Sequence, residues 1–234
     1  VNRTFTKRQD SQESNRTQRV LLLGNTGIGK TAAINYFLRR ALEAEYRVLV
    51  ETREMRYYFH GGTVEWEKLS DSLLENHRTN RSVLFLVDHQ QGQSPPFCNA
   101  FTVAPVSPDP ANYSEWDKNG CLRLWMPLTT REEVVAMNSI EPQVDEGVLE
   151  ERLLKYGPIP RLLFRRDQET AAQLLRSKIA AFDFRKCRDL GVLVSGELPE
   201  SKSGLSWWIM HVTTTDLRKP SSVSWATTYV MQQV

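Results

Sequence analysis

The residues whose types and spacing could do chemistry lie between Gly24 and Thr31, in the sequence GNTGIGKT. This spacing satisfies G-x-x-x-x-G-K-[ST], the pattern of a phosphate-binding P-loop. Glycines let successive main-chain N–H groups point into one concavity, and a following helix adds the positive end of its dipole. We expect Lys30 to reach the β- and γ-phosphates of a nucleotide and the Thr31 hydroxyl to bind Mg²⁺. The predicted phosphate-binding residues are Gly24, Asn25, Thr26, Gly27, Ile28, Gly29, Lys30 and Thr31.

The structural alternative is a glycine-rich turn between a strand and a helix that carries a lysine without binding phosphate. The flanking sequence favours the P-loop, because an apolar run precedes the glycines and a helical pattern follows them. That strand–turn–helix context is the one the motif requires.

A second candidate is Asp88, which ends the apolar run SVLFLVD at residues 82–88. This is the Walker B pattern, in which a carboxylate at the end of a central strand lies beside the P-loop and holds Mg²⁺ through water. We therefore predict Lys30 and Asp88 as the catalytic pair and Thr31 and Asp88 as the metal-binding pair. A turn or capping role for Asp88 is the alternative.

The residue that would activate water for hydrolysis is not where many related enzymes carry it. An acidic residue often follows the Walker B aspartate, but here the next residue is His89. Glu51, at the end of another predicted strand, is a candidate substitute, with a surface carboxylate as the alternative. Ser107 also follows a predicted strand, where its hydroxyl could sense the γ-phosphate, although a plain turn explains it equally well. The pattern predicts slow or absent hydrolysis.

Strands and helices alternate along residues 20–128, which predicts an α/β fold with a mostly parallel sheet and helices on both faces. The expected strands cover residues 20–24, 46–52, 82–88, 100–106 and 121–126, and a hairpin is expected from 55–59 and 63–66. The expected helices of this part cover residues 32–44, 69–77 and 113–118.

The rest of the chain reads as helices followed by a late strand. We expect helices from Arg131 onward, over 146–156 and over 169–182, then a strand within 205–213 and a helix over 224–234. The predicted domains are a flexible polar arm (1–19), a P-loop domain (20–128), a helical lid (129–190) and a C-terminal αβ segment (191–234). Because the chain begins with Val1 and ends within a predicted helix, we expect it to be a truncated part of a longer protein.

Composition narrows the class of protein. Of the 234 residues, 40% are hydrophobic and 25% are charged, which is typical of a globular domain, and no apolar run approaches a membrane span. The net charge of +2 is too small to indicate nucleic-acid binding by itself. Cys98, Cys121 and Cys187 are odd in number and lack CxxC spacing, so neither a disulfide framework nor a zinc site is indicated, and we expect reduced thiols in an intracellular compartment.

Several stretches together resemble the retrotransposon hot spot proteins of trypanosomatids. They are the P-loop itself, the strand SVLFLVD and the segments VSPDPANYSEWDK, LWMPLTTREEVVAMN and LEERLLKYGPIPRLLF. The similarity runs from about Val20 to the C-terminal end and is strongest up to Phe164. GPIPR is its most specific part. The family often has Pro where this chain has Thr26, a change that leaves the glycines and the lysine intact.

This resemblance implies a P-loop NTPase core of the additional-strand branch, which includes AAA+ and signal-transduction ATPases, with ATP as ligand and GTP as the alternative. It also implies a multigene family with mostly nuclear members, some tied to transcription and mRNA export, and with many pseudogenes. In related signal-transduction ATPases a Gly-x-Pro motif of the lid contacts the adenine. Pro160 and Arg161 are the nearest equivalents here, with Arg161 as a phosphate sensor. A rigid connection between two helices is the alternative.

Three functions follow from these features. The first is a nucleotide-dependent switch or slow ATPase, in which the nucleotide sets the position of the lid and the lid presents a partner surface. The second is an active ATPase that remodels nuclear protein or nucleoprotein complexes, which requires a homo-oligomer and an arginine from a neighbouring copy, with Arg123, Arg131 or Arg161 as candidates. The third is a degenerate scaffold without nucleotide binding, against which the intact glycines and Lys30 argue.

Overall fold

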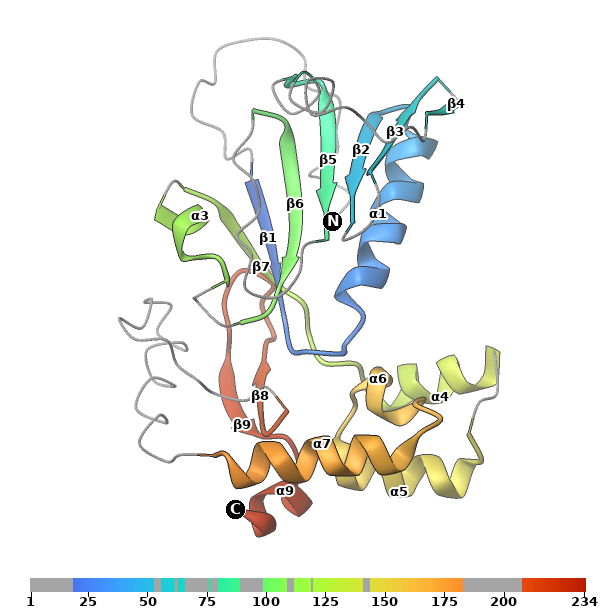
Figure 1. Cartoon of the computed structure of the whole chain (residues 1–234), viewed down its shortest axis with the longest axis vertical. Coiled ribbons are helices and arrows are strands. Elements are labelled where there is room, and N and C mark those ends of the chain that lie inside the picture. The colour runs from blue at the N-terminus through green and yellow to red at the C-terminus, as the bar shows by residue number, and fades with distance from the viewer. Residues whose placement is uncertain are drawn as a thin grey trace.

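The computed structural model describes residues 19–52, 56–61, 63–65, 76, 80–88, 99–108, 112–118, 120–140, 144–182 and 208–234. Its main sheet has seven strands (Figure 1). They are β1 (Arg19–Leu23), β2 (Arg47–Glu51), β3 (Arg56–His60), β4 (Thr63–Glu65), β5 (Val83–Val87), β6 (Phe101–Val106) and β7 (Leu122–Trp125).

The order of these strands across the sheet is β4-β3-β2-β5-β6-β1-β7. Strands β2, β5, β6, β1 and β7 pair in parallel, whereas β3 and β4 add an antiparallel hairpin at one edge. The predicted mostly parallel sheet and its hairpin are therefore confirmed. Strand β6 lies between β1 and β5, which is the additional-strand arrangement. Because parallel strands share a direction, Gly24 after β1 and Asp88 after β5 both lie at the carboxyl ends of the strands, on the same side of the sheet.

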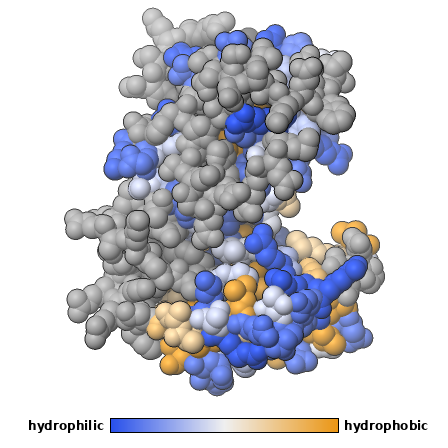
Figure 2. Space-filling model, in the orientation of Figure 1, coloured by the Kyte–Doolittle hydropathy of each residue, from blue (hydrophilic) through white to orange (hydrophobic). Residues whose placement is uncertain are grey.

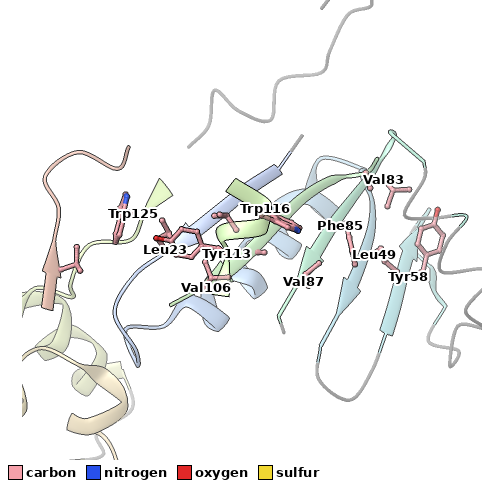
Figure 3. Packing of buried hydrophobic residues seen from close by; sticks show 14 residues of the cluster. Leu23, Leu49, Tyr58, Val83, Phe85, Val87, Val106, Tyr113, Trp116 and Trp125 are labelled. Carbon is pink, nitrogen blue, oxygen red and sulfur yellow. The ribbon is translucent and has the colours of Figure 1, made fainter. Parts of the chain in front are cut away.

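Helices cover both faces of the sheet, as predicted. On one face α1 (Lys30–Glu43) buries Ile34 and Ala41 against Val20 and Leu84. On the other face α3 (Ser114–Lys118) contributes Trp116, which is fully buried, and Figure 3 shows it with Tyr113 beside the strand residues Leu23 and Val106. Burial of side chains of this size contributes about 1.5–3 kcal/mol each, so the α3 segment is an integral part of the core.

A helical region follows the sheet and lies beneath it in Figure 1. It consists of α4 (Arg131–Ile140), α5 (Glu146–Tyr156), α6 (Pro160–Leu163) and α7 (Gln168–Ala180). The Asp145 and Asp167 side chains cap α5 and α7 by accepting hydrogen bonds from the first-turn N–H groups of each helix. In the view of Figure 2, the apolar surface of the described residues gathers over this region, where Ile140 and Leu154 are strongly exposed.

The C-terminal segment corrects one prediction. The late strand is present as β8 (Met210–Thr213), and among the described residues it pairs with β9 (Ser222–Trp225) in an antiparallel hairpin outside the main sheet. The predicted helix over 224–234 therefore begins late, as α9 (Thr228–Gln233). Two causes are visible in the sequence. Val223 and Trp225 alternate with serines, a strand pattern, and Thr227 caps α9 by accepting a hydrogen bond from the Val230 N–H.

Some predicted features lie outside the described residues. These are residues 1–18 of the arm, His89, Cys98, Cys187 and residues 205–207 of the late strand. The predicted helix over 69–77 also lies outside them, except for Asn76. Arg19, assigned to the arm, begins β1. Among the helices described, none combines the length and the hydropathy that a bilayer crossing requires.

Candidate functional site

The loop between β1 and α1 has the backbone geometry that the motif predicts. Gly27 and Gly29 adopt φ angles of 87° and 99°, a region that side-chain-bearing residues rarely enter, and Gly29 is the N-terminal cap of α1. Gly24 is required for space, because a Cβ atom there would lie 2.7 Å from Cδ1 of Ile28. The predicted strand–turn–helix unit is therefore present, with the N-terminus of a 14-residue helix at its end.

Lys30 is folded back onto the loop that precedes it. Its Nζ donates hydrogen bonds of 2.7 Å to the main-chain carbonyls of Gly24 and Asn25. Burial, together with the positive charge of Arg161, lowers the pKa of Lys30 to about 8, while Asp88 acts in the opposite direction. The charges of Arg161 and Asp88 therefore act on Lys30 beside the loop, and cations and a carboxylate are the groups that a magnesium–polyphosphate complex needs.

The two residues predicted to hold Mg²⁺ lie at the carboxyl ends of the parallel strands, as the P-loop does. Asp88 is half-buried, and its N–H donates to the carbonyl of Glu51 at 2.8 Å, which fixes the start of the loop after β5. Thr31 lies in the first turn of α1 and is exposed. A hydroxyl and a carboxylate are the hard oxygen ligands that Mg²⁺ prefers. No cluster of three or more His, Cys, Asp or Glu side chains occurs within the described residues.

The segment Gly157–Arg161 of the helical region contacts the P-loop directly. The Arg161 N–H donates to the carbonyl of Gly27 at 3.3 Å. A Cβ atom on Gly27 would lie 2.8 Å from Cγ2 of Ile159 and 3.0 Å from Cβ of Arg161. Pro160 occupies the first turn of α6, where its missing N–H costs no hydrogen bond. The GPIPR segment therefore packs against the P-loop.

The three arginines considered as phosphate contacts have different surroundings. The Arg123 guanidinium lies 6.0 Å from the centroid of the Tyr113 ring, and Arg131 pairs with Glu150 of α5. Arg161 alone among the three lies against the P-loop of its own chain, close enough to Lys30 to lower its pKa.

Two further candidates have protein partners. The Ser107 Oγ accepts a 2.5 Å hydrogen bond from Nδ2 of Asn112, and Asn112 is buried. Glu51 is only 6% exposed, and its carboxylate pairs with Nε of Arg56 at 3.2 Å. The surface-carboxylate alternative for Glu51 is therefore wrong. An ion pair also holds this carboxylate in place, which leaves it poorly suited to orient an attacking water.

Sequence reasoning missed what the side chains of Asn25 and Ile28 do. Asn25 is fully buried, donates from Nδ2 to the Val212 carbonyl at 2.7 Å and accepts from the Val212 N–H at Oδ1 at 3.0 Å. Ile28 is 3% exposed and packs in a core with Ile159 and Ile209. An apolar residue inside a glycine-rich loop is a signal for the burial of Ile28. No local signal points to Val212, which lies 187 residues from Asn25.

Comparisons with known proteins give distant likenesses. No family profile matches the chain. It is 22% identical over 219 residues to crinkler effector protein 16 of Phytophthora infestans, a match that covers 92% of this chain and 35% of that protein. The chain thus spans about a third of the length of this relative. A solved structure of an arginine-to-alanine variant of Thermotoga maritima RuvB is 13% identical, with a TM-score of 0.40, over 75% of this chain and 68% of that one.

Proposed function

We propose that the chain binds a nucleoside triphosphate with Mg²⁺ at the loop from Gly24 to Thr31. The observation that carries this proposal is the position of Lys30, whose half-buried ammonium is held by two main-chain carbonyls of the loop and whose pKa responds to the charges of Arg161 and Asp88. A polyphosphate offers Lys30 stronger, charge-assisted partners than two neutral carbonyls. Lys30 and Arg161 then neutralise the phosphates, and Thr31 and Asp88 hold Mg²⁺.

The nucleotide acts as a switch that sets how the helical region sits against the sheet. Its phosphates meet both the P-loop and Arg161, and Arg161 lies in α6 of the helical region. A ligand that contacts two elements at once favours the arrangement in which both contacts are made. Hydrolysis is slow, because His89 stands where related enzymes carry an acidic residue and because Glu51 is paired with Arg56.

The identity of the nucleotide and the cellular setting are extensions of this proposal. The similarity of GPIPR and the flanking segments to retrotransposon hot spot proteins supports membership of that multigene family, ATP as the ligand and a nuclear location linked to transcription or mRNA export. GTP remains the alternative ligand. The proposal for Pro160 is that it borders the base, as the resemblance to the Gly-x-Pro motif of signal-transduction ATPases implies, and the neighbouring Ile159 and Arg161 lie against Gly27.

Titration with a fluorescent ATP analogue in the presence of Mg²⁺ tests nucleotide binding. The wild-type chain should bind, and Lys30→Ala should weaken binding strongly because it removes the buried ammonium. The matched control is Lys219→Ala, the same substitution at an exposed lysine in the turn between β8 and β9. Equal binding by wild type and Lys30→Ala would refute the proposed role of the loop. Competition with unlabelled ATP and GTP then gives the base preference.

A steady-state phosphate-release assay tests the switch against an active remodelling ATPase. Slow turnover by a monomer supports the switch. Fast turnover that Asp88→Asn abolishes, together with nucleotide-dependent oligomers on a sizing column, would support the remodelling enzyme instead. In that case Arg123→Ala and Arg131→Ala identify an arginine supplied by a neighbouring copy, since the variant that lacks it would lose turnover without losing nucleotide binding.

A further inference from the structure

We propose that Asn25 makes the β8–β9 hairpin part of the nucleotide site, as a positioning residue that holds the P-loop through the main chain of Val212. The inference rests on the proposed function, because it concerns how the same loop is kept in shape for phosphate. It assigns to the C-terminal hairpin a role that neither the motif nor the comparisons indicate.

The contact between Asn25 and Val212 is buried and fully paired. The side-chain amide donates to the Val212 carbonyl at 2.7 Å and accepts from the Val212 N–H at 3.0 Å, and Asn25 has no exposed surface. One side chain therefore satisfies both main-chain groups of a strand residue. Truncation of Asn25 leaves the N–H and the carbonyl of Val212 buried without partners. Because buried unpaired groups carry a desolvation cost, breaking this contact is energetically unfavourable.

Val212 offers these two groups because of its register in the hairpin. The Ala226 N–H donates to the Ile209 carbonyl at 2.7 Å, and residues that bond the partner strand alternate along an antiparallel ladder. Val212 therefore directs its N–H and C=O to the outer edge of β8, where Asn25 takes the place of a further strand. The turn of the hairpin is fixed separately, because the Trp125 N–H of β7 donates to the Leu217 carbonyl at 2.6 Å.

The same residue is also bonded to the phosphate-binding lysine. The main-chain carbonyl of Asn25 accepts from Nζ of Lys30, while its side chain holds Val212. On the other side of the loop, Ile28 packs in one core with Ile209 and Met210. When phosphates draw Lys30 from the carbonyls, the link to Val212 is what keeps Asn25 in place. By reciprocity, a ligand that requires this loop geometry stabilises the hairpin in return.

Nucleotide affinity of three variants of the full chain tests the positioning role. With the fluorescent ATP analogue and Mg²⁺, we expect Asn25→Ala to bind about tenfold more weakly than wild type, within the roughly 5- to 150-fold range of coupling between sites. Asn25→Asp keeps an acceptor for the Val212 N–H, but it sets a carboxylate oxygen against the Val212 carbonyl and adds negative charge to the loop, so it should bind no more tightly than Asn25→Ala. The control is Thr213→Val, which removes the exposed 2.6 Å contact between the Thr213 and Ser222 hydroxyls and leaves the link to Asn25 intact. Its affinity should match that of wild type.

Hydrogen exchange at the Val212 amide separates positioning from a merely structural role. In wild type, saturating MgATP analogue should slow exchange at this amide. In Asn25→Ala, or in Asn25→Asp if the alanine variant does not fold, this nucleotide-dependent slowing should be lost even at saturation. Its persistence, or equal affinity of Asn25→Ala and wild type, would overturn the inference and leave nucleotide binding standing. Failure of wild type itself to bind overturns the proposed function and this inference together.

Discussion

Substitution of Gly27 by alanine should destabilise the protein through two separate effects. Alanine at φ 87° carries a backbone cost of about 1–2 kcal/mol, because its Cβ meets the main chain in the left-handed region. The new methyl group would also lie 2.8 Å from Cγ2 of Ile159 and 3.0 Å from Cβ of Arg161, closer than van der Waals contact allows. Overpacking of this kind costs about 1–3 kcal/mol, so the sum is about 2–5 kcal/mol.

Gly120→Ala is the matched control, because Gly120 has φ 70° and no atom within 4 Å of its virtual Cβ. This variant carries only the backbone cost of about 1–2 kcal/mol. The difference between the two variants therefore measures the contact between the P-loop and α6. Urea unfolding gives both free energies, and thermal unfolding should show a decrease in Tm of roughly 4–20 °C for Gly27→Ala, since each kcal/mol shifts Tm by about 2–4 °C in a chain of this size.

A double-mutant cycle identifies the contact responsible. Ile159→Ala removes Cγ2, so the combined loss of stability in Gly27→Ala/Ile159→Ala should be smaller than the sum of the two single losses by about 0.5–3 kcal/mol. Equal losses for Gly27→Ala and Gly120→Ala, with additivity in the cycle, would show that the P-loop does not pack against α6 in solution and would refute this reasoning.

Three further predictions concern buried ionisable groups. Burial lowers the pKa of His211 to about 4, below its usual value of 6.5, so on acidification the unfolded chain takes up a proton before the folded one does. The free energy of unfolding, measured in urea titrations, should therefore fall by about 2 kcal/mol between pH 6.5 and 5. His211→Gln should lack this pH dependence. The pKa of Lys30 lies near 8 against 10.5 in the unfolded chain, so stability should rise with pH between these values, and Lys30→Met should lack the rise. Glu51→Gln should lower stability by about 1–3 kcal/mol in urea, because it removes the buried carboxylate that pairs with Arg56, while nucleotide affinity stays unchanged.

The sheet could be predicted from the sequence because its signals are local. The run Val83–Val87 is buried along its whole length, as a strand covered on both faces must be, and its apolar composition alone indicates this. The bounds of α5 were also predictable, since Asp145 caps its first turn and Gly157 ends it. The P-loop spacing likewise predicts a glycine with positive φ at Gly29, because such backbone angles are available mainly to glycine.

The parts that could not be predicted depend on pairing and packing that no local sequence pattern indicates. The alternation of Val223 and Trp225 with serines suits a strand, but the same residues also suit the start of a helix, and pairing with β8 decides between the two. The pairing of Glu51 with Arg56 arises because the antiparallel register of β2 and β3 places the two residues opposite each other. Arg161 reaches the P-loop only through the packing of α6.

These contacts bear on what a P-loop motif specifies by itself. Glycines permit the φ angles of the loop, but they equally permit many others, so the motif lowers the cost of the phosphate-binding geometry without selecting it. In this chain the selection comes from outside the motif. Ile159 and Arg161 close against Gly27, and Val212 holds Asn25. The helical region and the C-terminal hairpin therefore brace the loop that we propose as the nucleotide site, and a change in either one should reach bound phosphates through the main chain of the loop.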